Sequence, residues 1–171
     1  MVNNRKSVNV HTSTTKPIRS RHYSTTHNTP RLAYTPTQIE PANPNPLIKP
    51  GRKPLVEAHF SEGAIQPFIH DFRVRLLHGH KESPFRVFVK RGQALTPNAC
   101  AAIIAGDVVI MRVAANDKDS AVNMRRTDRP MANFVFRECL HRISRFQSAE
   151  RTRLPTKDLV IVRQRAFPGL A

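Results

Sequence analysis

Hydrophobic and polar residues alternate along two stretches near the middle of the chain. In residues 72–76 apolar side chains occupy every second position with arginines between them, and residues 85–90 repeat the pattern. Such alternation is typical of a β-strand with one buried face. With a turn at His78-Gly79 and a loop over residues 81–84, the two stretches predict a hairpin. The residues expected to face a core are Phe72, Val74, Leu76, Phe85, Val87 and Val89.

The flanking residues predict further elements of a small β-domain. Residues 63–69 form a plausible first strand, and Pro67 within it favours an edge or a bulge. Thr96-Pro97 is typical of a helix start, and a short helix over residues 97–105 would end at Gly106. Residues 107–113 are apolar on both faces, as expected for a strand closed into a small barrel.

The C-terminal part completes this prediction. Residues 114–131 are polar and predict an exposed loop. Residues 133–139 predict a fifth strand, and residues 137–149 predict a helix with Leu140, Ile143 and Phe146 on its packing face. Residues 159–162 predict a strand that adds to a sheet edge. The order of elements predicts a mainly β protein, a five-stranded OB barrel with a short helix between strands 3 and 4 and a C-terminal helix and strand extension.

The N-terminal third differs in composition. Residues 1–55 hold nine lysines and arginines, a single acid, Glu40, and eight of the 14 prolines. We expect a long extended arm without a core, with a proline-punctuated linker over residues 36–54. Its Arg- and Ser/Thr-rich, acid-poor start fits either an organellar transit peptide or a disordered basic arm. The predicted parts are thus the arm (1–55), an OB domain (56–139) and an extension (140–171).

The net charge of the chain indicates what kind of partner it binds. The chain has 28 lysines and arginines against 12 acids, a formal net charge of +16, which favours a polyanion, first of all nucleic acid. A membrane is a weaker candidate, because no window approaches the roughly 20 apolar residues of a spanning helix. Cys100 and Cys139 lie far apart with no Cys-x-x-Cys pair, so we expect buried thiols in a reducing compartment and neither a zinc knuckle nor a disulfide framework.

Catalytic patterns are weak. His78-Gly79-His80 lies in a predicted turn with no acid or cysteine cluster nearby to complete a metal site. Asp117 and Asp119 fit a solvated loop. No Gly-rich phosphate loop, paired carboxylates or nucleophile elbow is found. We therefore expect a protein that is not an enzyme, with no cofactor, no metal and no small-molecule substrate.

The outer face of the predicted hairpin is the first candidate for RNA binding. Its cations would contact phosphates, and Phe88 would stack on a base, an interaction worth about 1–3 kcal/mol. The alternative is a solvated sheet face with an isolated exposed phenylalanine. Arginines of the 114–131 loop form a second candidate, since flexible cations can follow an irregular backbone. The predicted RNA-binding residues are Arg73, Arg75, Arg86, Phe88, Lys90, Arg125, Arg126, Arg129 and Arg137.

A resemblance to a known family rests on an ordered set of short motifs between residues 62 and 137. The segment resembles bacterial-type translation initiation factor one, a single small OB domain. It departs from that family by extra residues at 81–85 and by Gln93–Thr96, where the family is basic. The motifs that carry the resemblance are Glu62-Gly63, Phe72-Arg73-Val74, Gly79-His80, Asn98, Gly106-Asp107, Val109, Asp117 and Phe134-Val135-Phe136-Arg137.

The resemblance implies an organellar translation protein whose OB domain binds small-subunit ribosomal RNA near the decoding site and occludes it. The alternative is a permanent structural RNA-binding protein of a mitochondrial ribosome, or a ribosome assembly factor. A nucleic-acid-packaging coat protein fits the basic arm but not the strand context of Gly106-Asp107. The expected partners are ribosomal RNA and small-subunit proteins, without a membrane. The expected location is the mitochondrial matrix, with another organelle or a cytoplasmic ribonucleoprotein left open.

Overall fold

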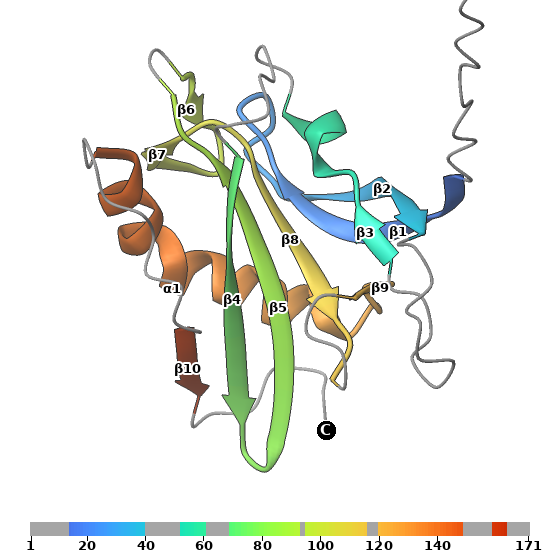
Figure 1. Ribbon diagram of the computed structural model, residues 1–171. Coiled ribbons are helices and arrows are strands. Elements are labelled where there is room, and N and C mark those ends of the chain that lie inside the picture. Colours follow the sequence, from blue (N-terminus) through green and yellow to red (C-terminus); the bar gives the residue numbers. More distant parts are fainter. Residues whose placement is uncertain are drawn as a thin grey trace, which may run out of the picture.

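The computed structural model describes residues 14–39, 52–60, 69–92, 95–115, 120–148 and 159–163. Within these ranges the protein is mainly β, with one eight-stranded mixed sheet, a small two-stranded sheet and one α-helix that crosses behind the large sheet (Figure 1). The large sheet has the order β10-β4-β5-β8-β1-β2-β3, with β9 paired to β8. Its strands are β1 (Thr14–Tyr23), β2 (Arg31–Ile39), β3 (Arg52–Pro54), β4 (Ile69–His78), β5 (Lys81–Lys90), β8 (Val108–Val113), β9 (Ala121–Val122) and β10 (Leu159–Arg163).

Neighbouring strands run antiparallel except β10, which pairs in parallel with β4. The strand order has two ends, β10 and β3, so a closed barrel is not shown. The predicted strand over residues 159–162 is confirmed as the edge strand β10. Of the predicted first strand, residues 63–68 lie outside the described residues, and Ile69 begins β4.

The β4–β5 hairpin confirms the alternating pattern. Its six predicted core side chains are all buried in the main core, which lies between the sheet and the α-helix. The loop predicted over residues 81–84 is instead strand, because the hairpin turns tightly at Gly79-His80 and pairs His78 directly with Lys81. Gly79 has φ +56°, a conformation that favours glycine and permits this turn.

The helix α1 (Asp128–Ser148) corrects the strand predicted at residues 133–139. Phe134-Val135-Phe136 looks like a strand locally, but it belongs to a longer apolar stripe at helical spacing that covers the sheet. Packing of that stripe outweighs the local β propensity. The helix predicted over residues 137–149 is therefore right in kind and starts earlier. The buried apolar residues of α1 are Ala132, Val135, Phe136, Cys139, Ile143 and Phe146.

The helix predicted over residues 97–105 is also wrong. These residues form β6 (Pro97–Asn98) and β7 (Ala101–Ala105), a small hairpin. The buried Asn98 stabilises it: its Nδ2 donates to the carbonyls of Tyr23 and Gly106, and its Oδ1 accepts from the Cys100 N–H. Asparagine side chains stabilise turns in this way and compete with a helix start.

The loop predicted over residues 114–131 contains regular structure at two places. The short strand β9 pairs with the end of β8, and α1 already begins at Asp128. Asp117 and Asp119, predicted to be solvated, lie outside the described residues. The polar composition of this stretch therefore does not indicate the strand β9 or the start of α1, although both are present.

Residues 14–39 are not part of an extended arm. They form β1 and β2, and β1 lies inside the sheet between β2 and β8. Ile18 and Tyr23 are buried, and the Tyr23 ring stacks on Phe136 at 3.8 Å between centroids. Composition is misleading here, because the buried contact between the two strands is partly polar: the hydroxyls of Ser20 and Thr35 are 2.9 Å apart and both side chains are buried. Residues 1–13 and 40–51 lie outside the described residues.

The face of the sheet opposite α1 carries a second, smaller core. A 3-10 helix, η1 (Val56–His59), follows β3 and contributes to this core (Figure 1). Phe88 of β5 packs there and is 5% exposed. The members of this second core are Ile18, Val56, Phe60, Phe88, Val109, Met111 and Ala121.

Candidate nucleic-acid interface

Two of the arginines predicted on the outer face of the β4–β5 hairpin, Arg75 and Arg86, are paired with acids of the same hairpin. Arg75 makes two 2.7 Å hydrogen bonds to the Glu82 carboxylate, and Arg86 Nε lies 2.7 Å from Asp71. Arg73, directly across from Arg86, is half-buried. The Glu82 and Asp71 carboxylates therefore offset the charges of Arg75 and Arg86, and this face offers less positive charge to RNA than the sequence indicates.

Phe88 and Lys90 do not lie on an open platform. Phe88 belongs to the second core, and Lys90 is only 7% exposed. The Arg86 guanidinium lies 5.1 Å from the centroid of the Phe88 ring. Because Phe88 is 5% exposed and packs in the same core as Val56 and Phe60, its ring offers little open surface on which a base could stack.

The loop arginines lie on the other side of the molecule, at the start of α1. Arg125 and Arg126 are exposed just before the helix, Arg129 is half-buried in its first turn, and Arg137 is exposed two turns further on. Of the predicted residues, Arg73 and Arg75 line a small pocket on the hairpin together with Glu82. Arg125 lines a much larger pocket with two arginines that the sequence does not single out.

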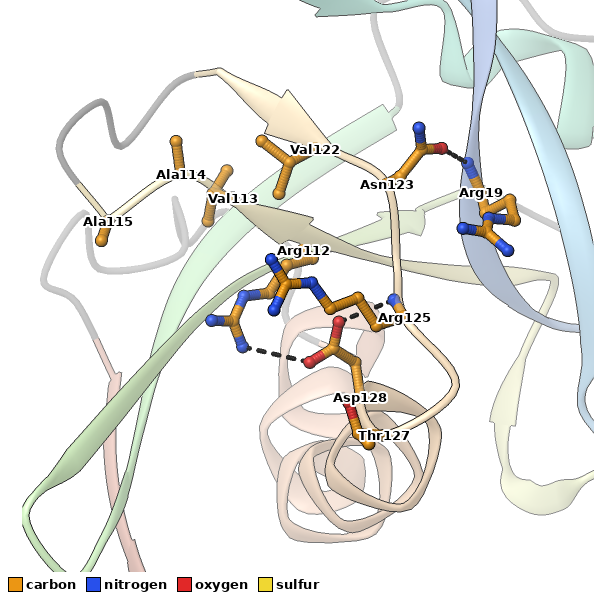
Figure 2. Close-up of a pocket in the computed structure, with 10 residues that line it drawn as sticks. All are labelled: Arg19, Arg112, Val113, Ala114, Ala115, Val122, Asn123, Arg125, Thr127 and Asp128. Carbon is orange, nitrogen blue, oxygen red and sulfur yellow. Dashed lines mark hydrogen bonds and ion pairs between the residues drawn. The ribbon is translucent and has the colours of Figure 1, made fainter. Parts of the chain in front are cut away.

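This arginine pocket, of about 490 Å³, lies where β1, β8 and the segment before α1 meet (Figure 2). Its cations are Arg19 of β1, Arg112 of β8 and Arg125. Figure 2 shows Arg19 on one side, the Val113–Ala115 backbone on the other, and Arg112 and Arg125 between them, above Asp128. The lining residues are Arg19, Arg112, Val113, Ala114, Ala115, Val122, Asn123, Arg125, Thr127 and Asp128.

Strand alternation positions Arg112. Val108 and Ile110 face α1, so Arg112 at the end of the same strand points to the same side, beside the first turn of the helix. Its guanidinium lies 5.5 Å from the centroid of the Phe85 ring and 3.4 Å from the Asp128 carboxylate, and its side chain is 22% exposed. Arg112 is therefore held in place while part of it stays open to the pocket.

Backbone hydrogen bonds tie Arg19 and Arg125 to the same site. The Asn123 Oδ1 accepts from the Arg19 N–H at 2.9 Å, and the Met124 N–H donates to the Arg19 carbonyl at 3.0 Å. The Asp128 carboxylate accepts from the Arg125 N–H at 2.7 Å, while the Asp128 N–H donates to the Arg125 carbonyl. This reciprocal pair resembles one half of a capping box and closes the turn that starts the helix.

The electrostatics of the pocket favour an anion. Three arginines line it and Asp128 is the one acid among its lining residues, so the cations are in excess. The backbone amides at a helix start add partial positive charge. Arginine presents a planar fork of donors that matches a phosphate group. A bound phosphate would therefore reduce the repulsion among the three arginines, which the single carboxylate of Asp128 offsets only in part.

Positive charge continues along the seam between β1 and α1. Arg21 Nε and the Tyr23 hydroxyl both donate to the Asn133 Oδ1, at 3.2 and 2.9 Å. Burial raises the pKa of Tyr23 above its usual range, while the nearby Arg21 and Arg137 act to lower it. Arg137 thus lies close enough to β1 to affect Tyr23, and its side chain is exposed on α1.

Arg19 and Arg112 are site residues that the sequence does not predict. The pattern places Arg19 in an arm and Arg112 in an apolar strand, so neither stands out as a candidate. One signal is available, because a single arginine inside the run Val108–Val113 is unusual for a strand that is otherwise buried.

No family model, curated protein or solved structure matches this chain. No helix among the described residues is long and apolar enough to cross a bilayer. A group of three or more His, Cys, Asp or Glu side chains suited to a metal ion is likewise not found in the described ranges.

Proposed function

We propose that this protein binds RNA as a component of a ribonucleoprotein particle, and that the arginine pocket holds the RNA backbone. The observation that carries the proposal is the convergence of Arg19, Arg112 and Arg125, from three separate parts of the chain, on a pocket with one carboxylate. The net charge of +16 supports a polyanionic partner, and RNA phosphates suit arginine forks.

The particle we propose is a mitochondrial ribosome, in contact with ribosomal RNA and proteins of the small subunit. We favour a permanent structural component, because the folded unit already includes residues 14–39 and anchors its C-terminal strand β10 on the sheet edge. The proposed role is binding and not catalysis, and it needs no cofactor. The proposal also places the protein in the mitochondrial matrix.

A factor that resembles translation initiation factor one is the second candidate. Phe72-Arg73-Val74 lies in strand β4, and Gly106-Asp107 directly precedes β8, as that resemblance requires. Phe134–Arg137, however, lies in α1 and not in a closing strand, and the OB barrel would need a closure that the strand order lacks. A high-salt wash of isolated ribosomes separates the two candidates, since a structural component stays bound and a factor is released.

RNA binding is tested by titrating purified protein with fluorescent fragments of small-subunit ribosomal RNA between about 50 and 500 mM salt. The double variant Arg19→Glu/Arg125→Glu should weaken binding strongly. On single strands it should also reduce the slope of log affinity against log salt by about 0.7 for each phosphate that is no longer neutralised.

The matched control is Lys81→Glu/Arg145→Glu, which makes the same change of charge at exposed positions outside the pocket. This control should bind RNA more tightly than Arg19→Glu/Arg125→Glu does, because its two cations do not converge on one phosphate. Equal losses in both variants, or binding without salt dependence, would contradict the proposal.

A further inference from the structure

The surface beside the arginine pocket carries an exposed aromatic ring. Among the phenylalanines and tyrosines that the structure describes, Tyr34 is the exposed one, at 60%, whereas seven others are buried and Phe134 is half-buried. Single exposed aromatic residues are common on protein surfaces, so exposure alone indicates nothing. The position of Tyr34 next to an arginine of the pocket is what indicates a role in binding.

Tyr34 lies directly across from Arg19 in the β1–β2 pair, and Leu32 lies across from Arg21. Directly opposed residues of an antiparallel pair project from the same face, with Cβ atoms about 4.5–5.5 Å apart. Arg19, Arg21 and Tyr23 alternate along β1, and Tyr23 faces α1 through its stack on Phe136. Tyr34 is therefore on the α1 side of the sheet, next to a residue that lines the pocket.

We propose that Tyr34 stacks on an unpaired base of an RNA whose neighbouring phosphate is held in the arginine pocket. The inference rests on the proposed function and deepens it, because it specifies RNA with at least one unstacked nucleotide at this site. A base in a duplex is already stacked on both faces and cannot lie on a tyrosine, whereas bases of loops, bulges and ends can. An aromatic ring can stack on the base of such a nucleotide while a cation beside it binds the phosphate.

The contrast with Phe88 supports the assignment. Phe88 also has an arginine beside it, but it is 5% exposed and packs in the second core. On the β1–β2 surface no described aromatic residue stacks on Tyr34, and its ring is open to solvent. The aromatic platform expected on β5 is therefore found on β2.

The test compares a single-stranded oligouridine with a blunt RNA duplex of the same length, each titrated with wild type, Tyr34→Thr and Tyr34→Phe. Threonine removes the ring and keeps a good strand former, while phenylalanine keeps the stacking surface. Tyr34→Thr should bind the single strand about 5- to 100-fold more weakly and the duplex within about twofold of wild type. Tyr34→Phe should bind both RNAs within about twofold of wild type.

Tyrosine emission gives a second readout, because the chain has two tyrosines and no tryptophan. Oligouridine should quench the emission of wild type, and should leave the emission of Tyr34→Phe, which comes from the buried Tyr23, nearly unchanged. An unaltered affinity of Tyr34→Thr for the single strand, or equal losses for single strand and duplex, would overturn the stacking inference. Salt-dependent binding that is lost in Arg19→Glu/Arg125→Glu would still leave the proposed function standing, whereas a wild type that binds neither RNA would overturn both.

Discussion

The guanidinium of Arg112 lies 3.4 Å from the carboxylate of Asp128, so the end of β8 is joined to the first residue of α1. The same carboxylate binds the Arg125 N–H. One acid therefore starts the helix, holds Arg112 and limits the positive charge of the pocket. Its removal should act on stability and on binding in opposite directions.

Asp128→Asn is expected to lower the free energy of unfolding by about 1–3 kcal/mol, because Arg112 loses its ion pair in a half-buried position. RNA affinity at low salt should rise about fivefold, equivalent to about 1 kcal/mol, since the pocket gains one net positive charge. Urea denaturation and RNA titration measure the two effects.

Asp71→Asn is the matched control for Asp128→Asn. It removes the 2.7 Å ion pair between Arg86 and Asp71 on the opposite face of the sheet, where the Asp71 side chain is 36% exposed. It should change stability by less than about 1 kcal/mol. A larger gain in RNA affinity for Asp71→Asn than for Asp128→Asn would move the binding surface to the β4–β5 face.

The inclusion of β1 in the fold is tested at Tyr23. Tyr23→Ala removes a buried ring that stacks on Phe136, and should cost about 3–5 kcal/mol of unfolding free energy. Tyr23→Phe removes the hydrogen bond to Asn133 and should cost about 1 kcal/mol. Tyr34→Ala, at an exposed position of the next strand, should cost less than about 1 kcal/mol. Similar values for Tyr23→Ala and Tyr34→Ala would mean that residues 14–23 do not belong to the core.

The β6–β7 hairpin is expected to depend on Asn98. Asn98→Ala leaves the carbonyls of Tyr23 and Gly106 without their donor and the Cys100 N–H without its acceptor, at a residue that is 2% exposed. We expect a loss of about 2–4 kcal/mol by chemical denaturation. Asn98→Asp keeps the acceptor and loses the donors, and places a charge beside two carbonyls, so it should not restore stability. A wild-type midpoint for either variant would contradict this role.

Acidification should destabilise the fold through His59 and Asp107. Burial and the neighbouring His22 lower the pKa of His59, whose Nε2 lies 2.8 Å from the Thr35 hydroxyl. Burial alone would raise the pKa of Asp107, but interactions with His22 and with the Thr25 N–H lower it. A group whose pKa is lower in the folded state stabilises the fold above its unfolded pKa, and this contribution is lost as the pH falls.

The free energy of unfolding should therefore fall as the pH drops below about 6.5, and again below about 4, the unfolded pKa values of histidine and aspartate. Denaturation at about pH 7.5, 5.5 and 3.5 measures both steps, and His59→Gln should reduce the first. Burial also lowers the pKa of His70, so His70→Gln is the comparison that separates the two histidines. A stability that does not change between about pH 7.5 and 5.5 would contradict the prediction.

The parts of the fold that can be predicted from the sequence are the elements that show a pattern among neighbouring residues. Phe72, Val74 and Leu76 alternate with polar residues because the two faces of β4 have different surroundings. Ile143 and Phe146 lie at helical spacing because α1 buries one stripe on the sheet. Each pattern can be recognised within a dozen positions.

The rest depends on partners far away in the chain. Ser20 is buried because Thr35 on the next strand satisfies its hydroxyl, and nothing around Ser20 itself indicates burial. Phe88 is buried in a core that also contains Val56 of η1 and Phe60 just after it, both distant in sequence. The arginine pocket likewise forms only when β1 meets β8, so neither Arg19 nor Arg112 is recognisable from its neighbours in sequence.

The place of β1 inside the sheet bears on how the chain must be made and delivered. Tyr23 pairs with Val108, so a polypeptide that emerges N-terminus first, from a ribosome or through a translocation channel, carries a β1–β2 hairpin whose second edge stays bare until residues 108–113 follow. Bare edges of this kind recruit foreign strands. We therefore expect the open edge of β1 to be a site of wrong strand pairing until residues 108–113 have been synthesised.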